Sequence, residues 1–593
     1  MTSIGEILNS VDINNLSSLI SAVDNISAAN NYGQSANIYF LRNFTVEGID
    51  PYLKYYLFKL NLKPNIVFGN YDEMRQEILD ENSNLHQMRP HLIILSLMLE
   101  QLDPGCLLPN WRSERVKDEI IKLFDLLASK SNSLIAVNTF VPPFRPNTGI
   151  ASLPLLPKQE DEIDGLNTLI RQYVKAHPNQ FILIDWERFI RILGEEKSMD
   201  YRYWYTARAP FKKEFNNLYA QEIAKIIKAL KGYAKKCLVL DCDNTLWGGV
   251  IGEDGLSGIK LDKNDYPGNA YYDFQMSILH LIERGVLVAI CSKNNEEDVW
   301  SVLDNHPYNL IKRSHLSGWR INWENKINNI VSLAGELNLG IDSFVFVDDS
   351  PTECELIKRY LPEITVLQVP EKLYLYPQLL LKDGLFDNLH TTNEDQQRTA
   401  LYQTEVQRKQ AKEQFKNIDD YLASLELMAA IHPINDYEIP RVAQLTQKTN
   451  QFNLTTRRYS EKEIRDLSLD PSWTIYSLSV KDKFGDYGLT GVIMVKHGGG
   501  EGMIDNFLLS CRILGRGLEH AFLSYCIKEL ETKKKVEHWL AEYIPTKKNQ
   551  QAANFWDEAG FMKIENEDGL KLYSMEKGKL RISGKNYIKI KEG

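Results

Sequence analysis

The segment LVLDCDNTLWGG at residues 238–249 constrains the fold more than any other part of this 593-residue chain. Its first three residues form a short apolar strand, and two acidic residues, Asp241 and Asp243, follow at once. In α/β proteins, ligands bind at the carboxyl ends of parallel strands. A DxDxT pattern directly after a strand therefore predicts an α/β sheet with a reactive site at its edge.

Short apolar runs alternate with helix-like stretches over most of the chain, as parallel α/β sheets require. We expect strands in the first block at 38–41, 65–68, 92–95, 134–137 and 181–184. In the second block we expect them at 237–240, 286–291, 344–347 and 365–369, and in a more mixed third block at 474–480 and 490–495. This pattern predicts two α/β domains, a doubly wound one at 1–230 and a second at 231–390. A charged helical linker is expected at 391–420 and an α+β domain at 421–593.

Composition excludes several classes of protein. The 69 basic and 79 acidic residues leave a net charge of −10, which disfavours general binding to nucleic acid or anionic membranes. Seven cysteines without a CxxC pair indicate neither a disulfide scaffold nor a structural zinc site. The most apolar run, residues 92–99, is far shorter than the ~20 residues of a membrane span. We therefore expect a cytoplasmic protein.

Paired carboxylates after one strand can divide the work of phosphoryl transfer. Asp241 can attack phosphorus as a nucleophile, and Asp243 can protonate the leaving oxygen and then activate water. Thr245 completes the pattern as a third candidate. The second strand ends at Ser292 and Lys293, which are candidates to bind phosphate oxygens.

Further charged residues fit the same chemistry in the same chain order. Lys326, in a helical stretch, can neutralise phosphate and nucleophile, and the third strand ends with Asp348 and Asp349. Oxygen ligands suit Mg²⁺. We expect this ion to be bound by the carboxylates of Asp241, Asp348 and Asp349 and by the backbone carbonyl of Asp243. Together with Lys326 it would offset the negative charge of the phosphate, the carboxylates and the leaving group.

These residues resemble the motifs of the haloacid-dehalogenase-like (HAD-like) phosphatases. Asp241 matches the phosphoryl-accepting nucleophile of that superfamily, Asp243 its acid/base, and Ser292, Lys326 and the Asp348–Asp349 pair its later motifs. The short spacings between these motifs leave no room for a large cap domain. A site without a cap domain leaves room for a substrate that is attached to a large carrier. The alternative is that another domain covers the site and excludes water.

A narrower resemblance covers roughly residues 38 to 575. It rests on the segments LVLDCDNTLWGGVIGEDG, AICSKNNEEDV, NWENK, VFVDDSPTE and KTNQFNLTTRR, which are similar to those of the FkbH-like glyceryl transferase/phosphatases of polyketide and tetronate pathways. The resemblance implies dephosphorylation of 1,3-bisphosphoglycerate and loading of its glyceryl group onto the phosphopantetheine thiol of an acyl carrier protein. It also implies an enzyme cysteine as acyl carrier, without saying which.

The third block resembles GCN5-related acetyltransferases (GNAT). It has an R-x-x-G-x-G loop before a helical stretch and a later NQQAANFWDEAGF segment. Glycines at a helix start let backbone N–H groups approach an anion. We expect coenzyme A or a pantetheine arm to bind at Arg512, Gly515, Arg516, Gly517, Asn549 and Asn554.

Two cysteines are the main candidates to carry an acyl group. Cys511 adjoins Arg512 and the predicted helix terminus, which could favour its thiolate form. Cys237 begins the strand that leads to Asp241. The alternative for each is a small buried apolar residue.

The first block resembles the SGNH-type hydrolases but departs from them at the catalytic residues. The expected serine position reads Arg42-Asn43-Phe44, and the expected DxxH reads Asp200 to Tyr203. A working esterase triad is therefore not predicted, and a structural or docking role is favoured.

We predict an Mg²⁺-dependent phosphatase coupled to glyceryl transfer onto an acyl carrier protein. Two alternatives stay open: a phosphatase plus acetyltransferase that acts on a small metabolite, and a scaffold that docks carrier proteins without catalysis.

Overall fold

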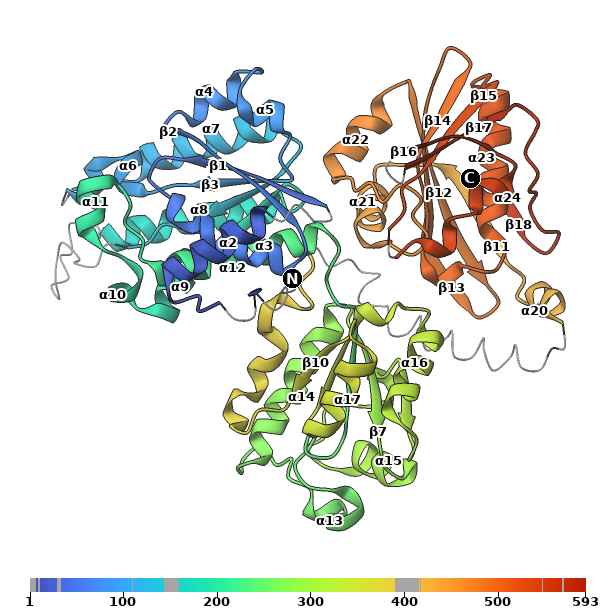
Figure 1. The fold of residues 1–593 in the computed structure, drawn as a ribbon, viewed down its shortest axis with the longest axis horizontal. Coiled ribbons are helices and arrows are strands. Elements are labelled where there is room, and N and C mark those ends of the chain that lie inside the picture. The colour runs from blue at the N-terminus through green and yellow to red at the C-terminus, as the bar shows by residue number, and fades with distance from the viewer. Residues whose placement is uncertain are drawn as a thin grey trace. The chain divides into compact units, whose positions relative to one another are not determined.

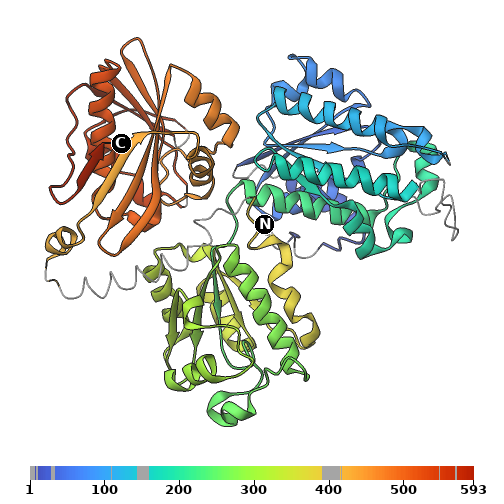
Figure 2. The same cartoon turned by 180° about the vertical axis from the view of Figure 1, so that it is seen from behind.

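The computed structural model describes residues 7–8, 11–28, 34–108, 110–142, 159–389, 415, 417–546, 548–567 and 570–592. These residues fall into two compact units, 1–231 and 232–593. Figures 1 and 2 show the ribbon from opposite sides, coloured along the chain. Most of the predicted linker at 391–420 lies outside the described residues. The prediction of an α/β protein with parallel sheets is confirmed, whereas the division of 232–593 into two domains stays a prediction.

The first unit contains a five-stranded parallel sheet of order β2-β1-β3-β4-β5. Its strands are β1 (Ser35–Arg42), β2 (Lys63–Tyr71), β3 (Leu92–Ser96), β4 (Leu134–Asn138) and β5 (Phe181–Ile184). Its helices are α2 (Leu16–Ala28), α3 (Asp50–Lys59), α4 (Met74–Leu79), α5 (Asn84–Met88), α6 (Leu99–Leu102), α7 (Glu114–Lys130), α8 (Gln159–Ala176), α9 (Trp186–Leu193), α10 (Glu195–Ser198), α11 (Tyr201–Ala207) and α12 (Lys213–Leu230).

Both faces of this sheet are buried, which explains its near-continuous apolar strands. On one face of the sheet, alternate side chains of β1 and β3 share a core with α4, α7 and α8. On the other face, the β1 side chains Ile38 and Phe40 are also fully buried. At the position expected for an esterase serine, the buried Asn43 exchanges two hydrogen bonds with the backbone of Met98. Asp200 caps α11 and pairs with Arg202. The SGNH resemblance itself stays a prediction.

The second unit begins with another five-stranded parallel sheet, of order β10-β9-β6-β7-β8. Its strands are β6 (Cys237–Leu240), β7 (Leu287–Ser292), β8 (Gly318–Ile321), β9 (Phe344–Asp348) and β10 (Thr365–Gln368). Its helices are α13 (Ile251–Gly258), α14 (Gly268–Glu283), α15 (Glu296–Asn305), α16 (Lys326–Leu337), α17 (Pro351–Tyr360) and the 3₁₀ helix η5 (Leu373–Gly384). Strand β8 was absent from the sequence-based expectation.

The eight-stranded sheet of the second unit has the order β16-β17-β15-β14-β13-β12-β11-β18. Its strands are β11 (Met428–Pro433), β12 (Trp473–Asp482), β13 (Gly485–Gly498), β14 (Glu501–Leu509), β15 (His538–Tyr543), β16 (Met562–Glu567), β17 (Leu570–Glu576) and β18 (Lys589–Glu592). Its helices are α20 (Ile418–Ser424), α21 (Ile439–Lys448), α22 (Glu461–Leu469), α23 (Leu518–Lys533) and α24 (Phe555–Ala559). The pairs β14–β15 and β11–β18 are parallel, and the other pairs are antiparallel.

No helix among the residues that the structure describes is both long and apolar enough to cross a membrane.

The imidazole of His91 predicts a pH dependence for the first unit. Its Nδ1 accepts a hydrogen bond from the Asn37 N–H (2.9 Å), and the Lys231 Nζ lies 3.1 Å from its Nε2. Burial, and then the charge of Lys231, lower the pKa of His91 from 6.5 to about 4. The unfolded chain therefore binds more protons between these values, so stability should fall as the pH drops from 6.5 to 4.

Hydrogen exchange of the β1 amides at pH 5 and pH 7.5 measures this effect. After correction for the intrinsic exchange rates, we expect the free energy of opening of the β1 amides to be lower at pH 5 than at pH 7.5. In His91→Gln the difference between the two pH values should be smaller. His177→Gln, at an exposed histidine of the same unit, is the control. An equal pH difference in wild type and His91→Gln would contradict the assignment.

Candidate active site

Asp241 is held at the edge of the sheet by a strand that is buried on both faces. Leu238 and Leu240 of β6 belong to one apolar core, and Cys237 and Val239 belong to the core on the other face. The Asp241 N–H donates to the Val347 carbonyl of β9, which continues the strand pairing as far as the carboxylate. The position of this side chain is therefore set by the central strand of the sheet.

Lys326 connects two of the strand ends. It is the first residue of α16 and is buried, and its Nζ lies 2.9 Å from Asp241 Oδ1 and 2.6 Å from Asp348 Oδ2. Burial alone would lower the pKa of Lys326, but the two carboxylates outweigh it and raise the pKa above its usual value. The lysine is therefore held as a cation between two buried anions.

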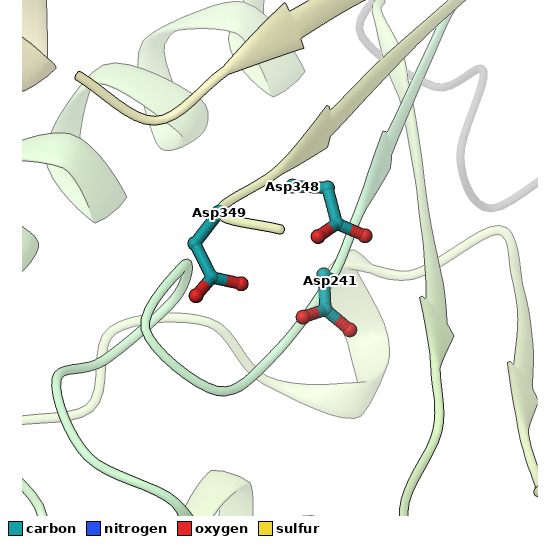
Figure 3. Close-up of side chains that lie close together, drawn as sticks. All are labelled: Asp241, Asp348 and Asp349. Carbon is teal, nitrogen blue, oxygen red and sulfur yellow. The ribbon is translucent and has the colours of Figure 1, made fainter. Parts of the chain in front are cut away.

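Three carboxylates meet at this edge of the sheet, as Figure 3 shows: Asp241, Asp348 and Asp349. One oxygen from each lies within 4.8 Å of the others. Burial, and next the charge of Asp241, raise the pKa of Asp348 to about 6 and also raise that of Asp349. With Lys326 as the counter-charge, the ionised group carries a formal charge of −2, since three negative charges face one positive charge.

The donor set fits a magnesium ion. All three groups offer carboxylate oxygens, the ligands that a hard divalent cation prefers, and their excess negative charge favours a cation. Thr245, four residues after Asp241, has a buried hydroxyl without a hydrogen-bond partner among the described residues. Its carbonyl accepts a hydrogen bond from the buried Tyr376 hydroxyl (2.7 Å), which fixes the loop after Asp241.

The Asp243 carboxylate is not one of the three clustered carboxylates. Its Oδ1 accepts hydrogen bonds from Trp247 Nε1 (2.9 Å) and the Ile251 N–H (3.1 Å), and its Oδ2 accepts one from Asn294 Nδ2 (2.9 Å). Three donors therefore fix the orientation of this carboxylate. A role for its backbone carbonyl stays a prediction.

Asn294 is a site residue that the sequence reasoning missed. Its side-chain amide donates both to Asp243 and to the Ser292 hydroxyl (3.1 Å), so it connects the first two motifs. Ser292 is buried at the end of β7. The sequence signal for it is its place in the segment AICSKNNEEDV, two residues after Ser292.

Lys293 does not join the cluster of carboxylates. Its Nζ pairs with Glu353 of α17 at 2.7 Å, and its side chain is 39% exposed. A contact with phosphate would have to compete with this ion pair, so the predicted phosphate-binding role is not supported by the geometry.

The R-x-x-G-x-G loop lies between β14 and α23. Gly515 and Gly517 have φ values of +74° and +76°, which favour glycine, and Gly517 is the N-cap of α23. The Arg516 side chain is buried, lies 3.7 Å from Asp482 and donates to Tyr487. It therefore faces the protein interior, and the prediction that it binds an anionic arm is corrected to a structural role.

The other predicted arm-binding residues have different environments. Asn549 is fully buried, and its side chain bonds to the backbone of Asn453, Ile544 and Thr546, so we correct its assignment to a structural one. Asn554 is exposed at the start of α24, and the half-buried Arg512 donates to Ser510 Oγ at 3.3 Å. Both could reach a ligand.

The segment KTNQFNLTTRR contributes a short extended stretch between β14 and β15. The parallel pairing of these strands ends at Ile504 and Ala541. Beyond that point the Leu454 N–H donates to Phe507 O, and the Ile544 N–H donates to Leu454 O. The segment therefore occupies backbone hydrogen-bonding groups where β14 and β15 separate. An extended ligand cannot pair with the same groups.

The seven cysteines, all of them described, are free thiols. Cys237 is fully buried in the core, and burial raises the pKa of its thiol, so it is not suited to carry an acyl group. Cys511 is half-buried at the start of the 3₁₀ helix η6 (Cys511–Ile513), and the other six are buried.

No family model and no curated protein matches this chain. Among solved structures, the N-terminal part of protein BF1531 from Bacteroides fragilis, which contains a phosphatase domain complexed with Mg, is 23% identical with a TM-score of 0.55. The match covers 66% of this chain and 100% of that one, and it shows a shared fold.

Two N-acetyltransferases also match. The ribosomal-protein-S18-alanine N-acetyltransferase from Escherichia coli covers 27% of this chain and 98% of its own length, with 17% identity and a TM-score of 0.21. A spermidine N-acetyltransferase SpeG mutant from Vibrio cholerae covers 25% of this chain and 93% of its own, with 11% identity and a TM-score of 0.20.

Removal of the Lys326 charge should destabilise the second unit. In Lys326→Met, buried carboxylates lose their counter-charge, and breaking a buried ion pair typically costs about 3–5 kcal/mol of unfolding free energy. We expect a lower melting temperature in EDTA and a larger rise on adding Mg²⁺ than for wild type. Lys358→Met, which removes an exposed lysine of α17, is the control. Equal melting temperatures for the two variants would contradict the assignment.

Proposed function

We propose that this chain is an Mg²⁺-dependent phosphatase that also transfers an acyl group. The observation that supports it most directly is the pairing of Asp241 with Lys326 beside Asp348 and Asp349, at the carboxyl edge of a parallel sheet. The proposed substrate is 1,3-bisphosphoglycerate, and the proposed acceptor is the phosphopantetheine thiol of an acyl carrier protein. The FkbH-like motifs support this choice of substrate and acceptor.

The phosphatase step begins with attack by the Asp241 carboxylate on the phosphorus of the 3-phosphate ester. The P–O bond to the glyceryl oxygen breaks, and Asp243 gives that oxygen a proton. The Oδ2 atom of Asp243 accepts one hydrogen bond and has a second lone pair on which this proton can reside. Asp243 then takes a proton from water, which attacks the phosphoryl-Asp241 and releases inorganic phosphate.

Other side chains bind and orient the phosphoryl group. The Lys326 ammonium is next to the Asp241 oxygen, and the Ser292 hydroxyl can donate to a phosphate oxygen. Mg²⁺ held by Asp241, Asp348 and Asp349 would supply positive charge against the phosphoryl oxygens. Asn294 holds both Asp243 and Ser292, so it sets the distance between acid and phosphate.

The acyl step uses the other end of the substrate. A thiolate attacks the carbonyl carbon of the acyl phosphate, the C–O bond to phosphate breaks, and a thioester and inorganic phosphate form. Cys511 is the candidate among the enzyme thiols because the six others are buried. The carrier thiol would then attack this thioester and restore the cysteine.

Asp241→Asn should abolish phosphate release, because an amide is a poor nucleophile and a poor metal ligand. We expect a loss of at least about a thousandfold in turnover with unchanged circular dichroism. The measurement is inorganic phosphate released from 1,3-bisphosphoglycerate with Mg²⁺ and without a carrier protein, where the acyl step can release at most one phosphate per enzyme. Wild type in EDTA should be similarly inactive. Asp273→Asn, at an exposed residue of α14, is the control. Phosphate release by Asp241→Asn at the wild-type rate would contradict the assignment of Asp241 as the nucleophile.

Gly515→Val tests the second half-reaction. Gly515 has a φ of +74° and open space around its missing Cβ, so a valine should strain the loop and block an approaching arm. We expect acyl transfer to a carrier protein to fall at least about tenfold, while phosphate release stays within twofold of wild type.

Gly578→Val is a matched control for this strain, since Gly578 has a φ of +72° and equally open surroundings. Equal loss of transfer in both variants would indicate a general folding effect. Unchanged transfer in Gly515→Val would remove the loop from the proposed arm site.

A further inference from the structure

Trp323 is a large apolar side chain exposed to solvent beside the candidate active site. It lies three residues before Lys326, and 70% of its surface is exposed. The two nearby tryptophans behave differently: Trp300 and Trp319 pack edge to face with ring centroids 5.2 Å apart. Trp323 makes no ring contact of this kind among the described residues.

The indole is nevertheless held in one position. Its Nε1 donates to Asn295 Oδ1 at 3.1 Å. The Asn322 N–H donates to the Ser292 carbonyl (3.1 Å), and the Asn322 side chain accepts from Asn329 Nδ2 (2.8 Å). This loop is therefore fixed against the end of β7 on one side and against α16 on the other.

The contact with Asn295 connects Trp323 to the reacting groups. Asn294 bonds to Asp243 and Ser292, and the next residue bonds to the indole. Asn295 is the third residue after Ser292, so the Cα atoms of the two lie at most about 11 Å apart. The indole therefore lies at the rim of the phosphate site.

Trp323 therefore presents an exposed aromatic side chain beside a small polar site. Aromatic rings at the rim of a small polar site can contact the organic part of a bound phosphate while the polar groups hold the phosphate itself.

We infer that Trp323 is a specificity-determining residue whose indole face contacts the organic part of the phosphate substrate. The inference rests on the proposed phosphatase activity at Asp241. It assigns a substrate class: phosphate esters and acyl phosphates whose organic part extends past the phosphate and offers C–H or planar surface. Phosphate and metal binding stay with Ser292, Lys326 and the three carboxylates.

Two non-hydrolysable phosphonates test this contact, because they differ only in their organic part. Methylphosphonate and phenylphosphonate are used as competitive inhibitors of acetyl phosphate hydrolysis with Mg²⁺, and their binding is also measured by calorimetry. In wild type we expect phenylphosphonate to bind roughly threefold to tenfold more tightly, as an aromatic contact allows. Trp323→Ala should remove this preference for phenylphosphonate. Its dissociation constant for methylphosphonate should stay within twofold of the wild-type value.

Two further variants separate contact from folding. Trp323→Phe keeps an aromatic ring but loses the bond to Asn295, so it should keep most of the preference. Tyr360→Ala removes a 60% exposed aromatic at the far end of α17 and should change nothing.

Three results would overturn the inference. Wild type could bind both phosphonates equally, or Trp323→Ala could keep the phenyl preference. Trp323→Ala could also weaken both ligands equally, which would show that the residue only positions the loop. If wild type neither binds a phosphonate nor hydrolyses a phosphate, the proposed function fails and this inference fails with it.

Discussion

The buried contact of Lys326 with Asp241 and Asp348 is the interaction on which the candidate site depends. Asp241 directly follows β6 and Asp348 ends the neighbouring parallel strand β9, so the fold brings two carboxylates together at one edge of the sheet. Such a pair is unfavourable without a cation, and the first residue of α16 supplies one. Asp349 adds further negative charge, which is why this edge fits a divalent ion as well as a lysine.

Much of this edge could be predicted because it follows from local rules. Asp241, Ser292 and Asp348 each stand at the end of an apolar run, and the carboxyl ends of parallel strands meet at one edge. The α/β architecture follows from the same alternation of apolar runs and amphipathic stretches. Strand β8 was missed because Gly318–Ile321 is short and only partly apolar.

The rest of the site could not be read from spacing, because side-chain direction depends on tertiary contacts. Arg516 fits a phosphate-loop pattern, yet Asp482 and Tyr487 draw its guanidinium into the interior. Asn549 fits a ligand-binding motif but satisfies backbone groups between β15 and α24. Asn294 had no recognised role, although it holds both Asp243 and Ser292. Each residue also has a partner distant in sequence, which spacing along the chain does not reveal: Asp482 for Arg516, Asn453 for Asn549 and Asp243 for Asn294.

The central claim is that Asp241 becomes phosphorylated during turnover, and trapping that species tests it most directly. The protein is mixed with 1,3-bisphosphoglycerate and Mg²⁺, quenched in acid within milliseconds, and mapped by peptide mass spectrometry. The account predicts one phosphoryl adduct on the peptide that contains Asp241, which disappears on longer incubation and never forms in EDTA. Turnover without that adduct, or an adduct on a different residue, would contradict it.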